Sequence, residues 1–252
     1  MKRRATVVWL LVSAFLLPVA SGAQTMDTIG LGQDSSGGNF LVDSKGMTLY
    51  YFTNDVAGKS GCNGGCAKAW PAFYAPTIQV SSPLAASDFG TIDRADGSKQ
   101  TTYMGWPLYY WMNDKKPGDV SGEGVGKVWY TLKVPAYTVM IATDKALGNY
   151  LVDGKGMTLY WFAKDSPATS AGTGQKNPYW PAFAPSSFVV PSALNEGDFG
   201  TIVRGDGTQQ ATYKGYPLYY FVKDMKRGDA TGQNVRNIWF VIDPDKFPVG
   251  NM

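Results

Sequence analysis

The sequence predicts an all-β protein built of two tandem, duplicated domains. A ten-residue stretch at 46–55 returns at 105–114, 156–165 and 215–224 with the pattern G-x-x-L-Y-x-(F/W)-x-x-D. The segment 39–132 also matches the segment 149–242 at a constant offset of 110 residues, with 44 of 94 positions identical. Short apolar and aromatic runs between Gly-rich turns are typical of strands. Because repeats decide the architecture, these observations favour tandem β domains.

The first 23 residues have the features of a secretory signal peptide. A basic stretch at 2–4 precedes an apolar run at 7–17, which is too short for a comfortable membrane span. Small residues end at Ala23, so we expect cleavage after Ala23, with a retained N-terminal anchor as the alternative. The mature chain would hold no membrane span. Its predicted localisation is therefore periplasmic or secreted.

Charge argues against nucleic acid as a partner. Three of the 23 basic residues lie in the signal segment, so 20 Lys and Arg remain against 20 Asp and Glu. A formal net charge of zero gives no electrostatic basis for binding nucleic acid or an anionic membrane.

The only cysteines, Cys62 and Cys66, are separated by Asn-Gly-Gly. In an exported protein so close a pair predicts a disulfide. The chain contains no His, which excludes His-based catalytic triads and imidazole ligands.

The duplication divides the mature chain into domain 1, residues 24–134, and domain 2, residues 135–252. An older repeat with an offset of 59 residues relates two modules inside each domain, A and B in domain 1 and A′ and B′ in domain 2. We expect each domain to consist of two related β-meander modules. A four-bladed propeller-like arrangement of the four modules is the alternative.

The strands follow from the turns between them. Asp96-Gly97 and Asp206-Gly207 are strong hairpin signals. In domain 1 the expected strands are 40–43, 47–52, 89–94, 100–103, 107–111 and 128–132, and domain 2 repeats them, preceded by a strand-like segment at 137–142.

The motif run resembles a known bacterial family. The stretch at 46–55 is followed by a loop closed by the two cysteines and by Ala-Lys-Ala-Trp70-Pro71. This order is similar to secreted repeat proteins of unknown function, also described as predicted lipoproteins with a Y-x-(F/W/Y)-x-x-D motif. The resemblance covers both domains and implies export and a small β domain. The chain departs from it by lacking a lipid-accepting Cys, and domain 2 has Gly172 and Lys176 at the cysteine positions.

The four repeated aspartates are candidate metal ligands. Carboxylate oxygens with loop carbonyls are typical of Ca²⁺ sites. The alternative is that each Asp accepts backbone N–H bonds in the Gly-rich loop that follows it. The candidate residues are Asp55, Asp114, Asp165 and Asp224.

Neighbouring aromatic residues of the motif cannot all point the same way. Since alternate residues of a strand face opposite sides, Tyr50 and Tyr51 cannot both face one core. We therefore expect one aromatic row per module to be exposed, as a platform for a glycan or a partner protein. The candidate aromatic binding face consists of Tyr51, Trp106, Trp161 and Tyr216.

The residues predict no enzyme and no cofactor. Without His, a free Cys or a G-x-S-x-G motif, only carboxylates could act as catalytic groups. We expect an exported, non-catalytic binding or structural repeat protein of the bacterial cell envelope, with an envelope protein or glycan as partner. The alternative is a periplasmic protein that ligates Ca²⁺ or another metal and serves electron transfer or metal handling.

Overall fold

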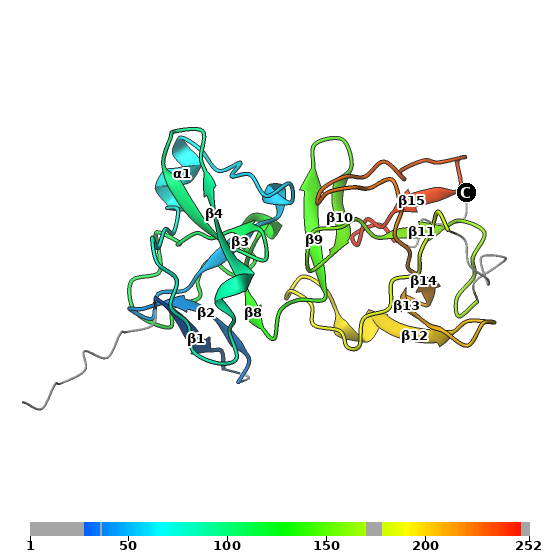
Figure 1. Ribbon diagram of the computed structural model, residues 1–252, viewed down its shortest axis with the longest axis horizontal. Coiled ribbons are helices and arrows are strands. Elements are labelled where there is room, and N and C mark those ends of the chain that lie inside the picture. Colours follow the sequence, from blue (N-terminus) through cyan, green and yellow to red (C-terminus); the bar gives the residue numbers. More distant parts are fainter. Residues whose placement is uncertain (1–27, 36, 170–177, 248–252) are drawn as a thin grey trace, which may run out of the picture.

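The computed structural model describes residues 28–35, 37–169 and 178–247. The predicted signal peptide lies outside these residues. The two domains lie side by side along the long axis, with domain 1 at one end and domain 2 at the other (Figure 1). Within the described residues the regular elements are strands, short 3-10 turns and one helix of five residues, α1 (Gly65–Ala69). The all-β prediction is confirmed.

Three small antiparallel sheets form domain 1, in the strand orders β1-β2-β8, β3-β7 and β4-β5-β6. The strands are β1 (Ile29–Gln33), β2 (Asn39–Asp43), β3 (Tyr50–Phe52), β4 (Phe89–Asp93), β5 (Lys99–Tyr103), β6 (Trp106–Pro107), β7 (Trp129–Thr131) and β8 (Lys133–Val134). The 3-10 turns are η1 (Thr53–Asp55), η2 (Ala86–Asp88) and η3 (Val125–Lys127).

Domain 2 repeats this plan with the sheets β9-β10, β11-β15 and β12-β13-β14. Its strands are β9 (Val139–Asp144), β10 (Gly148–Asp153), β11 (Tyr160–Phe162), β12 (Phe199–Val203), β13 (Gln209–Tyr213), β14 (Tyr216–Pro217) and β15 (Trp239–Val241), with one 3-10 turn, η4 (Glu196–Asp198).

Strand pairing joins the two modules of each domain. In domain 1, β3 of module A pairs with β7 of module B, so that Phe52 lies opposite Trp129. In domain 2, β11 pairs with β15 in the same way. The sheets have two or three strands, whereas a propeller blade has four. The propeller-like alternative is therefore not observed.

The expected strands at 47–52 and 107–111 are only partly regular, because β3 begins at Tyr50 and β6 ends at Pro107. Tyr109 instead forms isolated bridges to Tyr50 and to Ala72, so it links separate segments rather than extending one ladder. The sequence did not predict β1, whose glycines have low β propensity.

The β9–β10 hairpin lies between the two domains, and its faces pack in two different cores. Met140 and Ala142 belong to the apolar cluster of domain 1. Val139 and Ile141, which alternate with them along β9, belong to the cluster of domain 2. One hairpin therefore supplies core residues to both domains and packs them together.

Candidate functional site

The Tyr and the Asp of the repeated motif contact each other across modules. The Tyr50 hydroxyl of module A donates a hydrogen bond to Asp114 Oδ2 of module B at 2.7 Å. The Tyr109 hydroxyl of module B donates in turn to Asp55 Oδ2 of module A. Domain 2 repeats the exchange, at 2.6 Å for Tyr160 with Asp224 and 2.8 Å for Tyr219 with Asp165.

Backbone bonds bring the two motifs of a domain together. The Tyr50 amide donates to the Tyr109 carbonyl at 2.9 Å, and the Tyr109 amide donates to the Tyr50 carbonyl at 3.0 Å. Because the motifs run antiparallel beside each other, the Asp that follows each Tyr by five residues reaches the hydroxyl of the other Tyr. The spacing of the motif is thereby explained as the geometry of module pairing.

The second carboxylate oxygen of the motif Asp holds the loop that follows it. Asp55 Oδ1 accepts a bond from the Gly61 amide at 2.7 Å. Asp114 Oδ1 accepts from the Ser121 amide at 3.0 Å and the Ser121 hydroxyl at 2.7 Å, and Asp224 does the same with Thr231. Loop bonding, the alternative to metal ligation, is thus what these three carboxylates do.

Burial changes the acidity of these groups. Asp55 is fully buried, and this desolvation raises its pKa to about 6, against the opposing effect of the bonds from Tyr109 and Gly61 and of the charges of Arg94 and Arg227. Burial likewise raises the pKa of the Tyr109 hydroxyl well above its usual value, and the Asp55 charge adds to the shift. The Tyr109 hydroxyl is therefore a hydrogen-bond donor at every physiological pH.

The aspartates do not gather into a metal centre. Among the described residues, no group of three or more His, Cys, Asp and Glu side chains could hold a metal ion. Each motif Asp instead bonds to a Tyr hydroxyl of the neighbouring module. A metal at Asp55, Asp114, Asp165 and Asp224 remains a prediction from the sequence that these contacts do not favour.

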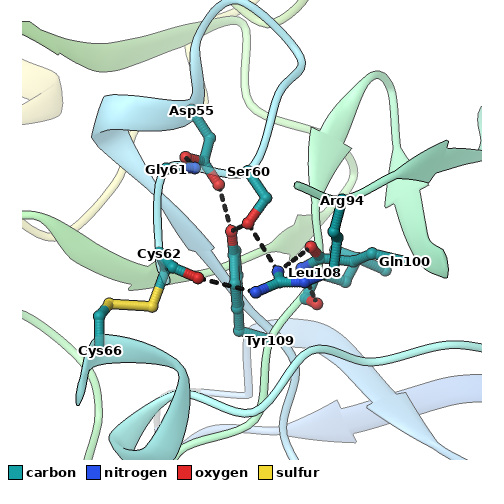
Figure 2. The surroundings of a disulfide bond; sticks show 9 residues. All are labelled: Asp55, Ser60, Gly61, Cys62, Cys66, Arg94, Gln100, Leu108 and Tyr109. Carbon is teal, nitrogen blue, oxygen red and sulfur yellow. Dashed lines mark hydrogen bonds between the residues drawn. A yellow bond between two sulfur atoms is a disulfide. The ribbon is translucent and has the colours of Figure 1, made fainter. Parts of the chain in front are cut away.

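The predicted disulfide joins Cys62 and Cys66. It closes a loop directly beside the Asp55–Tyr109 pair, as Figure 2 shows. The Tyr109 hydroxyl also bonds to Ser60 at 2.8 Å, so two residues just before Cys62, Ser60 and Gly61, contact the buried pair. The corresponding loop of domain 2, at 170–177, lies outside the described residues.

Arg94 is an internal support of the disulfide loop. Its guanidinium donates to the Cys62 carbonyl at 2.7 Å, the Ser60 hydroxyl at 2.6 Å and the Gln100 side chain (Figure 2). Its side chain is only 2% exposed, and Asp96, at 3.7 Å, is exposed. A buried cation needs such partners, so Arg94 fixes the loop from inside the domain.

The expected exposure of the aromatic row is wrong for three of its four members. Tyr51 and Trp106 are fully buried, Trp161 is 7% exposed, and Tyr216 is half-buried. Alternation along the strand is correct, but both faces of β3 are covered. Trp70 packs against Tyr50 on one side, and domain 2 covers Tyr51 on the other.

Arg227 of domain 2 contacts domain 1 at three points. Its guanidinium donates to the Val56 carbonyl and, at 2.9 Å, to the Met104 carbonyl of domain 1. It also lies over the Trp106 ring, 4.8 Å from the centroid. The Trp106 indole N–H donates to the Gly154 carbonyl of domain 2 at 3.2 Å. The aromatic row of domain 1 is therefore an interface between domains.

Sequence reasoning missed Arg227 as an interface residue. Its counterpart in domain 1 is Pro117, so the position departs from the repeat. This departure from the repeat could have identified Arg227, because a position that is Pro in one copy and Arg in the other has a different role in each copy.

Each domain also contains a stack of four rings. In domain 1 the Phe52, Trp129, Trp70 and Trp111 rings follow one another with centroid separations of 4.2, 3.9 and 4.1 Å. In domain 2 the corresponding separations are 4.5, 3.8 and 4.3 Å, for Phe162, Trp239, Trp180 and Phe221. The repeated Trp of every module is therefore a packing residue.

The cavities do not reach the Tyr or the Asp of the motif. One cavity of about 440 Å³ lies at the interface between the two domains and is bordered by Asp88, Met104 and Lys155. Another, of about 290 Å³, lies between Tyr130 and Ile141. Neither is lined by the Tyr or the Asp of any motif copy, so the repeated residues do not shape a binding pocket there.

A family described as a secreted repeat of unknown function matches the chain in four segments, residues 33–73, 90–133, 142–184 and 200–243. These segments follow the four modules and together cover more than half of the chain. The chain belongs to this family. The secreted repeat family indicates a location outside the cytoplasm, and no helix among the described residues is long and apolar enough to cross a membrane. Searches of curated proteins and of solved structures return no match.

Proposed function

We propose that this secreted repeat protein is a non-catalytic binding or structural protein of the bacterial cell envelope, released into the periplasm or medium by cleavage after Ala23. The observation that carries the proposal is the reciprocal Tyr–Asp bonding of the motif. Residues that recur in every module are used to pair modules, as a framework requires. A general acid or base would need a carboxyl that can reach a substrate.

The contacts of the carboxylates support the absence of catalysis. Asp114 has a Tyr hydroxyl on one oxygen and a loop amide on the other, and it is buried. The same arrangement in domain 2 holds Asp224. Partner binding would then use surfaces outside the motif, presented by two domains that Arg227 and the β9–β10 hairpin hold together.

Two assays on residues 24–252 test the proposal. The protein is incubated with chromogenic glycosides and esters, and separately with isolated cell-wall sacculi and immobilised envelope glycans. We expect no turnover and saturable retention by an envelope component. Asp114→Asn should lower the melting temperature and leave the binding affinity unchanged. Turnover abolished by Asp114→Asn or Asp224→Asn in a folded variant would overturn the proposal, as would the lack of retention by every envelope fraction.

A further inference from the structure

The cavity of about 440 Å³ between the two domains carries two side chains of opposite charge, Asp88 from domain 1 and Lys155 from domain 2. Its volume lies within the usual range of small-molecule sites, roughly 300–1,000 Å³. Phe89, Thr102 and Met104 also border it, and all of its lining residues belong to the described part of the chain. We call it the interface cavity.

The two charged groups of the interface cavity have no protein partner. The ion pairs among the described residues join other side chains. Within the same part of the chain, neither the Asp88 carboxylate nor the Lys155 ammonium takes part in a hydrogen bond. Asp88 is also half-buried, so its carboxylate is partly withdrawn from water. Each group is therefore available to form a charge-assisted bond with a bound molecule.

Backbone contacts hold both residues at the interface cavity. The Asp88 carbonyl accepts a bond from the Met104 amide at 2.7 Å, which joins the end of η2 to the residue after β5. Lys155 lies in the turn after β10, and the carbonyl of its neighbour Gly154 accepts the Trp106 indole N–H at 3.2 Å. The fold of domain 1 and the interface together set how far apart the two charges lie.

A buried hydroxyl also opens into the interface cavity. Thr102 is 5% exposed, and its hydroxyl forms no hydrogen bond within the described residues. The fully enclosed side-chain atoms that lack a partner do not include this hydroxyl, so it is reached from the cavity. Gly90 lies opposite Thr102, and a Cβ at Gly90 would come within 3.1 Å of the hydroxyl oxygen. The glycine therefore leaves a donor and acceptor uncovered.

We propose that the interface cavity binds a short peptide with free ends, whose ammonium group pairs with Asp88 and whose carboxylate pairs with Lys155. Such a ligand gives each unpaired charge of the protein a partner of opposite sign. Thr102 bonds to the peptide backbone, and the half-buried Phe89 and Met104 contact an apolar side chain.

A neutral glycan would leave both protein charges without a counter-charge, so the cavity favours a zwitterion over an uncharged sugar. The inference does not rest on the proposed envelope role. Retention by envelope fractions and peptide binding are separate measurements, and either can fail without the other.

Amide chemical shifts of isotope-labelled residues 24–252, followed by nuclear magnetic resonance, measure the binding of trialanine. We expect saturable shifts at Gly90, Thr102 and Gly105, which border the cavity. Acetylation of the amino end or amidation of the carboxyl end should weaken binding about tenfold, because each removes one charge-assisted bond. The absence of saturable shifts, or equal binding of the three peptides, would overturn the proposal.

Two variants assign the ends of the peptide. Lys155→Gln should bind trialanine about tenfold more weakly and no longer distinguish it from its amide. Asp88→Asn should lose the distinction between trialanine and its acetylated form. Because neither side chain bonds to another described residue, both variants should keep the melting temperature of the wild type.

Lys45→Gln is the matched control. Lys45 precedes Lys155 by 110 residues and lies in the corresponding turn after β2, where its amide donates to Asp43 Oδ1 at 2.8 Å. It does not border the interface cavity, so this variant should bind trialanine like the wild type. A loss in Lys45→Gln as large as that in Lys155→Gln would overturn the proposal, as would variants of Asp88 and Lys155 that still distinguish the blocked peptides.

Discussion

In domain 1 the aromatic row of Tyr51 and Trp106 is fully buried, whereas in domain 2 Trp161 retains 7% exposure and Tyr216 is half-buried. The Tyr–Asp framework beneath the two rows is the same. The rows differ because domain 1 is followed by another hairpin and domain 2 is not, within the described residues. A repeated aromatic row can therefore be fully buried in one copy and partly exposed in the next, depending on whether a further hairpin covers it.

Replacing one aromatic side chain of the row by Ala should show the largest difference in stability between the domains. Trp106→Ala removes a fully buried ring that contacts Tyr51 and Arg227, and we expect a loss of about 3–5 kcal/mol in the free energy of unfolding. Tyr216→Ala, the matched change in domain 2, should cost clearly less because its ring is only half-buried. Chemical denaturation monitored by circular dichroism measures both, and equal losses would contradict the comparison.

The stability of the fold should depend on pH through the buried carboxyl of Asp55. Its pKa is raised to about 6 in the fold, from 3.8, because it is buried. The native state thus holds a proton that the unfolded chain releases, so the contribution to stability is full below about pH 4 and is lost as pH rises to about 6. The loss is about 3 kcal/mol. Asp55→Asn should remove this slope in denaturation measured at several pH values. A wild-type slope unchanged by Asp55→Asn would assign it to other groups.

Arg227 should hold the domains together. Arg227→Met removes its bonds to two carbonyls and its contact with Trp106, at an expected cost of about 1.5–3 kcal/mol. Because the joint weakens more than either core, calorimetry should show two separate transitions in place of one. Lys226→Met, at the neighbouring exposed position, is the control and should leave the trace unchanged. A single transition in both variants would show that the hairpin alone joins the domains.

The disulfide should matter less than these packing residues. Cys62→Ser combined with Cys66→Ser opens a short loop, and we expect a cost of about 2 kcal/mol with the fold retained. Domain 2 supports this, because it keeps the same framework with Gly172 and Lys176 at those positions. Melting followed by circular dichroism gives the result, and loss of all β signal at room temperature would be the contrary outcome.

Calcium should have the smallest effect. The oxygens of Asp114 already accept bonds from Tyr50 and Ser121. Addition of Ca²⁺ or of a chelator is therefore expected to leave the melting temperature unchanged. A rise on Ca²⁺ addition that disappears in Asp114→Asn would restore the metal prediction.

The sequence predicted the repeat-based elements of the fold. The repeats predicted the modules, and the Asp-Gly turns predicted the hairpins at 96–97 and 206–207. The close cysteine pair predicted the disulfide. These signals can be read from short segments, or by comparing the sequence with itself, without knowing which distant segments come together in the fold.

Contacts between distant segments could not be predicted in the same way. Strand alternation correctly separated Tyr50 from Tyr51, but it carries no information on what covers each face. The cover of Tyr51 comes from β9 and Tyr137, more than eighty residues further along the chain. The Tyr–Asp exchange depends likewise on two motifs meeting antiparallel, which the spacing alone does not reveal.

Hydroxyl-radical footprinting of residues 24–252 at low concentration, read by mass spectrometry, tests most directly whether the row is covered in domain 1 and partly exposed in domain 2. Tyr51 and Trp106 should be protected, Tyr216 and Phe240 should be modified, and Tyr74, which is more exposed than these four, should react faster than all of them. Modification of Tyr51 and Trp106 at the rate of Tyr74 would contradict the account, because the row would then be a surface in both domains.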